Sequence, residues 1–132
     1  MITWDSLGSF LIYFGAALGA EAIFIALYML VTPHHEARLI KQGNVAASIS
    51  LGGAVIGFTL PLVSVIIGSV SLLDMVIWSA VALVVQIGVF ILTSLLLRGL
   101  SSRIEAGNIA AGVTLASASL AIGAINAASM SY

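Results

Sequence analysis

The fold class is decided by the stretch Met75–Leu97, MVIWSAVALVVQIGVFILTSLLL, which contains no Asp, Glu, Lys or Arg. A helix of about 20 apolar residues crosses the hydrocarbon core of a bilayer, which is about 30 Å thick. The same absence of charge extends over Gln42–Leu73 and Ala106–Tyr132, and the stretch before Thr32 is also long and apolar. We therefore predict an all-α, polytopic membrane protein with four transmembrane helices at Leu7–Val31, Val45–Ile67, Met75–Leu97 and Ile109–Met130.

The composition excludes most soluble functions. Charged residues make up 7% of the chain, whereas a soluble domain carries about 25%. The longest polar interval, Thr32–Asn44, is too short to fold into a catalytic or nucleic-acid-binding domain. The net charge of −1 provides no basic surface for nucleic acid, and the absence of cysteine removes disulfides and thiolate metal sites. We expect a non-enzymatic protein that binds the lipid bilayer but no cofactor, metal or nucleic acid.

The basic residues predict the orientation. All four Lys and Arg residues lie in two connecting segments, with Arg38 and Lys41 in the first and Arg98 and Arg103 in the second. Basic connecting segments stay on the cytoplasmic side, so these two are predicted to be cytoplasmic and both termini to face outward. The first span is predicted to be retained, because Asp5 precedes it where a signal peptide has a positive segment.

A short motif occurs twice. The sequence GNVAASISL at Gly43–Leu51 recurs as GNIAAGVTL at Gly107–Leu115. We interpret residues 1–132 as one transmembrane domain built from two parallel hairpin repeats, residues 1–67 and 68–132; the alternative is chance similarity between Ala-rich helices. Asn44 and Asn108 are predicted to be helix N-caps, because an Asn side chain can accept a hydrogen bond from a free N–H in the first turn. Ion binding is the alternative role for these two residues.

Glu21 is the only ionisable residue within a span other than the tyrosines, and it lies near the middle of the first one. A charged side chain there costs at least about 2.5–3.5 kcal/mol, so Glu21 is expected to be protonated, paired or beside water. We predict an ion or proton pathway that uses Glu21, Gln86, Tyr28 and Ser117. The structural alternative is a hydrogen bond from protonated Glu21 to Gln86 that joins the first and third spans.

Small residues predict close helix packing. Gly15-x-x-x-Gly19 and Gly53-x-x-x-Gly57 each allow two helix backbones to approach. The fourth span is so rich in Ala, Gly and Ser that we expect protein to surround it, which favours a homo-oligomer. Pro61 is predicted to kink the second span, because proline lacks an N–H and clashes with the preceding turn. A gate at Pro61 is the alternative.

The first cytoplasmic segment carries four polar residues of interest: His34, His35, Glu36 and Arg38. It is predicted to form a short interfacial helix that Thr32 caps, with Pro33 at its first position and Gly43 at its end. A metal site is not expected, because adjacent histidines point in different directions and no cysteine is present. The four residues are candidates for pH sensing or for binding a cytoplasmic partner, against the default of a solvated turn.

These motifs together resemble the YjfL-like bacterial inner-membrane family, which is catalogued as a domain of unknown function. The resemblance covers essentially the whole chain and implies a duplicated four-helix protein of the bacterial inner membrane. It also implies an association with phage-shock-type envelope proteins and peptide-ligase-like enzymes, but it provides no catalytic residues. The resemblance rests on Thr32-Pro33-His34-x-Glu36, Leu39-Ile40, Asn44 with Ala46-Ala47-Ser48, Pro61-Leu62, Gln86, and Asn108 with Ala110-Ala111-Gly112.

Two functions are therefore expected from the sequence. The preferred one is a small oligomeric ion or proton pathway through the membrane. The alternative is a non-catalytic membrane scaffold or envelope-stress sensor subunit that recruits a cytoplasmic partner protein.

Overall fold

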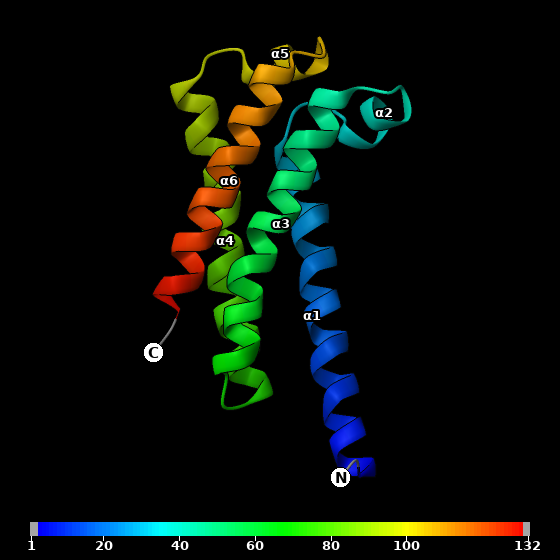
Figure 1. Cartoon of the computed structure of the whole chain (residues 1–132), viewed down its shortest axis with the longest axis vertical. Coiled ribbons are helices and arrows are strands. Elements are labelled where there is room, and N and C mark those ends of the chain that lie inside the picture. The colour runs from blue at the N-terminus through cyan, green and yellow to red at the C-terminus, as the bar shows by residue number, and fades with distance from the viewer. Residues whose placement is uncertain (1–2, 131–132) are drawn as a thin grey trace.

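The computed structural model describes residues 3–130, and this part of the chain is all-α (Figure 1). Four helices are long and apolar enough to cross a membrane, which agrees with the four predicted spans. Two short helices connect them in pairs. The elements are α1 (Trp4–Val31), α2 (Glu36–Lys41), α3 (Val45–Gly68), α4 (Leu72–Leu96), α5 (Leu100–Glu105) and α6 (Ile109–Ser129).

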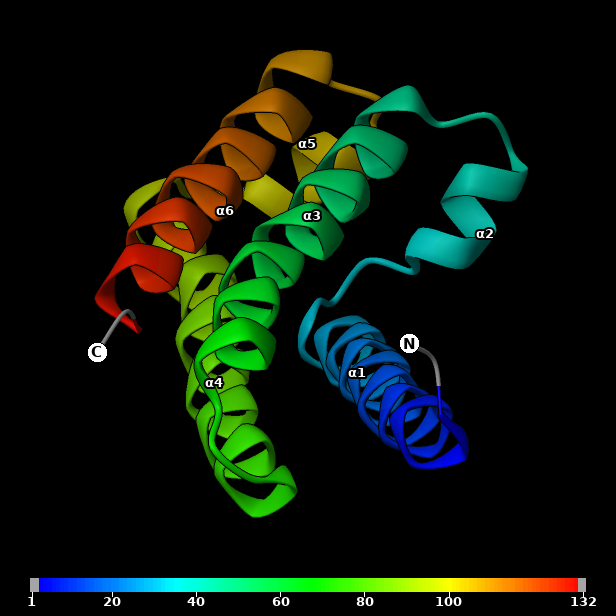
Figure 2. The ribbon, with the colours of Figure 1, turned by 60° about the horizontal axis from the view of Figure 1, so that its bottom comes forward.

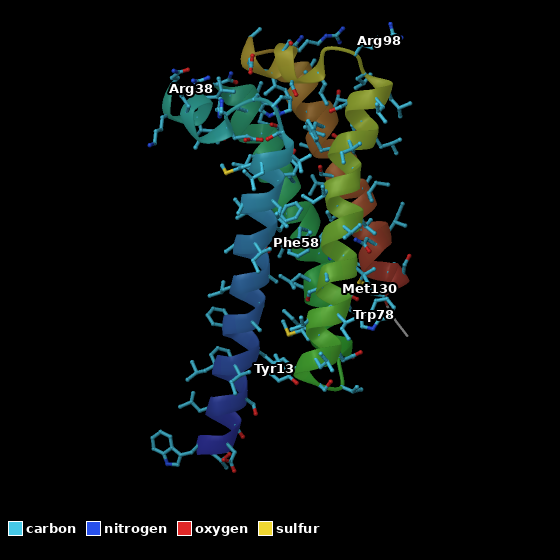
Figure 3. All side chains as sticks on the ribbon, turned by 180° about the vertical axis from the view of Figure 1, so that it is seen from behind. Tyr13, Arg38, Phe58, Trp78, Arg98 and Met130 are labelled. Carbon is cyan, nitrogen blue, oxygen red and sulfur yellow. The ribbon has the colours of Figure 1, made fainter. Side chains whose placement is uncertain are left out.

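The two short helices lie at the same end of the molecule, away from the N-terminus and from the turn between α3 and α4 (Figure 1). All four basic residues lie at this end, and Figure 3 shows Arg38 and Arg98 there. This end is called the basic end below. Its position agrees with four helices that run alternately up and down.

The predicted start of the short helix in the first connection is wrong. Thr32 ends α1, and its backbone N–H donates to the Tyr28 carbonyl. The helix α2 begins at Glu36, with His35 in the N-cap position and without a side-chain cap. Gly43 does follow the helix, with a positive φ of 82° that suits glycine.

The core of the fold is the contact between α3 and α6. A Cβ atom added at Gly53 would lie 2.4 Å from the Ala116 Cβ, and one at Gly57 would lie 2.5 Å from the Ser119 carbonyl oxygen. At Gly123 the added Cβ would lie 2.2 Å from the Gly57 carbonyl oxygen. The two backbones therefore touch along the helices, and the close packing predicted at Gly53 and Gly57 is confirmed.

Pro61 lies one turn after Gly57, whose carbonyl oxygen makes one of these contacts. It lies buried in α3, which runs unbroken from Val45 to Gly68. Because proline has no N–H, the carbonyl of Gly57 one turn earlier lacks its helical donor. That same carbonyl oxygen is the atom that packs against Gly123 of α6. The proline thus lies where the neighbouring helix comes closest.

The helix α1 is attached less closely than the other three. Phe24 and Tyr28 near its basic end are buried, whereas the residues before them are at most half-buried, and α1 diverges from the other helices toward its N-terminus (Figures 1 and 2). A Cβ added at Gly15 or Gly19 meets nothing within 4 Å. The predicted close packing at these two glycines is therefore absent from a single copy of the chain.

The expectation that protein surrounds α6 holds for one face only. Gly112, Ala116, Ser119 and Gly123 pack inward. The opposite face is exposed along its length and carries Ala110, Thr114, Ser117, Ala121, Ala124 and Ala128.

Candidate functional site

Glu21 lies half-buried on α1 and faces α3. Its Oε2 atom lies 2.9 Å from the hydroxyl oxygen of Thr59, and its buried Oε1 atom has no hydrogen-bond partner among residues 3–130. No ion pair within residues 3–130 joins this carboxyl group to a cation. Glu21 is therefore held in the membrane by one hydroxyl group and is not neutralised by a basic residue.

The Thr59 hydroxyl also contacts a second acceptor. Its oxygen lies 2.8 Å from the carbonyl oxygen of Val55. A hydroxyl group has one proton to donate, so it cannot fully serve both the Val55 carbonyl and a Glu21 carboxylate. Both contacts are good hydrogen bonds if Glu21 is the neutral acid, because Glu21 then donates to Thr59 and Thr59 donates to Val55. The two contacts of Thr59 therefore suit the neutral acid form of Glu21.

Gln86 belongs to a different polar cluster. It is buried on α4, and its Nε2 donates to the Ser119 carbonyl at 3.2 Å. Its Oε1 accepts a hydrogen bond of 3.2 Å from Asn126 Nδ2, which also lies 3.4 Å from the Ala82 carbonyl oxygen. This cluster joins α4 to α6. The structural alternative of a Glu21–Gln86 hydrogen bond is wrong for the single chain, since each residue has another partner.

The remaining predicted pathway residues lie in different surroundings. Tyr28 lies two turns after Glu21 on α1, and its buried hydroxyl group has no hydrogen-bond partner in the described chain. Phe24 lies between them and stacks on Phe58 of α3 with ring centroids 4.6 Å apart. Ser117 is exposed on α6. Of the four predicted pathway residues, only Glu21 and Tyr28 therefore share a helix face.

A second acidic group lies buried at the basic end. Glu36 and His34 are each 1% exposed, and Thr32 is 5% exposed. The Thr32 hydroxyl donates to Glu36 Oε1, and His34 Nε2 lies 3.4 Å from the same oxygen. The default of a solvated turn is thus wrong for His34 and Glu36, which are enclosed. His35 and Arg38 are exposed.

Burial favours the neutral forms of this pair. Loss of hydration raises the pKa of Glu36 above its ordinary value, although the Thr32 hydrogen bond acts in the opposite direction. Loss of hydration lowers the pKa of His34, while the negative charge of Glu105 on α5 raises it. The folded chain therefore holds a proton on Glu36 more firmly, and one on His34 less firmly, than the unfolded chain.

These opposite shifts predict a pH-dependent stability. The contribution of Glu36 to the free energy of unfolding is fully present below its ordinary pKa of 4.5. It is lost as pH rises through the pKa of Glu36 in the folded chain. The contribution of His34 is present above its ordinary pKa of 6.5 and is lost as pH falls through its folded pKa. Glutamine cannot take the charged form that burial disfavours. Relative to wild type, we therefore expect the free energy of unfolding of Glu36→Gln to rise by on the order of 1 kcal/mol at alkaline pH, and that of His34→Gln by a similar amount at acid pH.

Thermal unfolding in detergent between pH 4 and 9 measures both effects. Asp5→Asn is a control for Glu36→Gln, because it removes an exposed carboxylate from the opposite end of the molecule. Unfolding curves for Glu36→Gln that stay parallel to wild type across this range contradict the assignment.

The two asparagine caps are confirmed. Asn44 Oδ1 accepts from the Ala47 N–H at 3.0 Å, and Asn108 Oδ1 accepts from the Ala111 N–H at 3.2 Å. Asn44 has a further role, because its Nδ2 donates to the carbonyl oxygens of Ile104 at 2.8 Å and Glu105 at 3.2 Å. It therefore joins the start of α3 to the end of α5.

Sequence reasoning missed three partners in these sites. Thr59 and Asn126 are polar residues inside spans, and this could have identified them as candidates. Phe90 gave no polar signal, although its ring lies 6.1 Å from that of His34 and 5.9 Å from that of Tyr28.

Four helices of membrane-spanning length, with polar side chains enclosed between them, define a multi-pass integral membrane protein. The family model described as Domain of Unknown Function (DUF350) matches residues 1–130, and the chain belongs to this family. It is 41% identical over 128 residues, or 97% of each chain, to the UPF0719 inner membrane protein YjfL of Escherichia coli strain K12. Identity and coverage are the same for YjfL of Escherichia coli O157:H7. No solved structure matches the chain.

These findings confirm the predicted family and the predicted location. The chain is a multi-pass protein of the inner membrane.

Proposed function

We propose that this protein is a non-enzymatic, oligomeric pathway for protons or small cations across the inner membrane, with Glu21 as the residue that binds the ion. The observation that carries the proposal is the state of the Glu21 carboxyl group. It lies midway along a membrane-spanning helix, has one buried oxygen without a partner, and is held by the Thr59 hydroxyl alone. A buried acid is costly in a membrane, and such residues are usually functional.

The proposed pathway is formed by several copies of the chain. A single copy leaves two small-residue faces without a protein neighbour: the Gly15–Gly19 face of α1 and the outer face of α6 that carries Ser117. Small-residue faces let membrane helices pack closely, and ring symmetry repeats one acid around a central path. In this arrangement Ser117 enters a subunit contact, and Gln86 supports the path from within the α4–α6 cluster.

We also propose that the two halves of the chain are parallel repeats. The corners that start α3 and α6 support this, since Gly43 and Gly107 have φ values of 82° and 81°. The caps that follow them, Asn44 and Asn108, have φ values of −74° and −71°. Each corner comes after a short helix, α2 or α5, in the same order along the chain.

The basic end is proposed to face the cytoplasm. The chain contains no cysteine, so single cysteines at Ser6, Gln42, Ser71 and Ser102 report on orientation. An impermeant maleimide on intact cells that carry a permeabilised outer membrane is expected to label positions 6 and 71 only. Labelling of position 42 with protection of position 71 contradicts the orientation.

The pathway itself is tested with purified protein in proteoliposomes under a membrane potential between pH 5 and 8. We expect leakage of protons or cations above that of protein-free vesicles, and Glu21→Gln should reduce it to the vesicle background. Asp5→Asn is the matched control, because Asp5 is an exposed acid on the same helix. Equal leakage from wild type, Glu21→Gln and empty vesicles at every pH contradicts the pathway.

The second candidate function is a scaffold or envelope-stress sensor subunit that recruits a cytoplasmic protein. Its support is the exposure of His35, Arg38 and Lys41 at the basic end. Because His34 and Glu36 are enclosed, these exposed residues are the ones that a partner could contact. The flux experiment separates the two functions, since the scaffold requires no flux from wild type.

A further inference from the structure

The buried cluster at the basic end holds ionisable groups that the proposed pathway has not yet used. We propose that Glu36 and His34 form a proton-binding site that exchanges protons with the cytoplasm and supplies Glu21. This inference rests on the proposed function for its connection to Glu21, whereas the proton-binding site itself can be tested alone.

The geometry of the pair suits a shared proton. Glu36 Oε1 and His34 Nε2 are 3.4 Å apart, and both side chains are almost wholly shielded from solvent. This contact is within ion-pair distance, but neither ring nitrogen of His34 has a hydrogen-bond partner in the described chain. A buried polar atom without a partner is rare in a structure that serves stability alone. The ring can therefore gain a proton without breaking an existing hydrogen bond.

Tyr28 continues this site toward Glu21. It lies one turn before Thr32 on α1, its hydroxyl group is buried without a partner, and the charge of Glu36 acts on it. The gap between Tyr28 and Glu21 is occupied by Phe24, which stacks on Phe58. Transfer across this gap therefore needs water beside Phe24. The buried pair at the basic end and Glu21 are thus two separate proton-binding positions, and Tyr28 and Phe24 of α1 lie between them.

Access from the basic end is provided beside Phe90. A surface hollow of about 220 Å³ is lined by residues from the α1–α2 connection, α4 and α5, including Pro33, Phe90 and Ser94. Phe90 lines this hollow and also contacts His34 and Tyr28 with its ring. The ring therefore borders both the hollow and His34. In the proposed site, water reaches His34 from this hollow beside Phe90.

The charges around the pair favour exchange of one proton. Glu105 on α5 stabilises the protonated form of His34, and His35 in the connection disfavours it. Glu36 faces Thr32, His34 and His35, and its charge acts on Tyr28. In the proposed step, the neutral Glu36 acid gives its proton through water to the Glu21 carboxylate and becomes a carboxylate. His34 then takes a proton from a hydronium ion, which leaves as water, and the resulting imidazolium gives this proton to the Glu36 carboxylate. His34 and Glu36 thereby return to their neutral starting states.

Two measurements on the full-length protein in lipid vesicles test the inference. Infrared titration between pH 5 and 8 is expected to show a protonated carboxyl band that Glu36→Gln removes, while Glu21→Gln and the exposed-acid control Asp5→Asn retain it. In the proteoliposome assay, Glu36→Gln is expected to lose most of the wild-type flux. His34→Gln should lower the flux and flatten its pH dependence.

The outcomes separate this inference from the proposed function. If wild type conducts and Glu21→Gln does not, unchanged flux and pH dependence in Glu36→Gln overturn the inference alone. If wild type does not conduct, the proposed pathway and the proposed proton transfer to Glu21 are both overturned. The infrared band then decides whether Glu36 binds a proton. Absence of a Glu36 carboxyl band at every pH overturns the proton-binding site.

A second variant covers the case in which Glu36→Gln fails to fold. Thr32→Val preserves both ionisable groups and the shape of the side chain but removes the hydroxyl group that donates to Glu36. Loss of this donor disfavours the carboxylate, so the midpoint of the Glu36 band is expected to move to higher pH. An unmoved midpoint overturns the assignment of the band to this cluster.

Discussion

Replacement of Gly123 by alanine is expected to force α3 and α6 apart and to lower the free energy of unfolding strongly. The new Cβ atom would lie 2.2 Å from the Gly57 carbonyl oxygen, which belongs to the backbone and cannot rotate away. Overpacking in a well-packed core costs about 1–3 kcal/mol, and contact with a fixed backbone atom places this variant at the upper end. Thermal unfolding in detergent, followed by size-exclusion chromatography of the folded fraction, measures the loss.

Gly88→Ala is the matched control for this substitution. It makes the same chemical change in the membrane-spanning helix α4, but its Cβ atom meets nothing within 4 Å. We expect its melting temperature to stay at or slightly above that of wild type, because alanine favours a helix by about 1 kcal/mol relative to glycine. Equal melting temperatures for Gly123→Ala and Gly88→Ala contradict the close contact between α3 and α6.

The second large effect is expected at Asn44. Alanine at this position removes the N-cap of α3, at about 1 kcal/mol, and also both hydrogen bonds to α5. Each lost hydrogen bond contributes about 0.5–1.5 kcal/mol, less where the acceptor is solvated as at Glu105. The total expected loss in the free energy of unfolding is about 2 kcal/mol.

Asn108→Ala provides the comparison within the same chain. Asn108 caps α6 as Asn44 caps α3, but its side chain shows no hydrogen bond to another helix in the described chain. We expect Asn108→Ala to lose about 1 kcal/mol, the value of a cap alone. Asn44→Asp should also lose about 1 kcal/mol, because aspartate preserves the cap and loses the donor to α5. Equal losses for the two alanine variants contradict a joining role for Asn44.

The long helices were predictable from the sequence because their cause is local. Uncharged stretches such as Met75–Leu97 must be helical in a membrane, where each backbone polar group needs a partner within the protein. The caps at Asn44 and Asn108 were predictable for the same reason, since a cap bonds to its own first turn.

The surroundings of the polar residues were not predictable, because they depend on which helices become neighbours. Glu21 and Gln86 were predicted to share one pathway, yet Glu21 contacts α3 and Gln86 contacts α6. His34 and Glu36 follow a helix end and are typical of a solvated turn. They are enclosed because α1 ends at Thr32 and the chain packs back beside Phe90 of α4.

The contact between α3 and α6 has a consequence for biosynthesis. The ribosome completes α3 before α4, α5 and α6 exist, so the exposed backbone at Gly53 and Gly57 first meets lipid. The Gly57 carbonyl, which Pro61 deprives of its helical donor, acquires its close neighbour only when Gly123 arrives. The membrane-inserted nascent chain therefore lacks the close contact between α3 and α6 until α6 has been made.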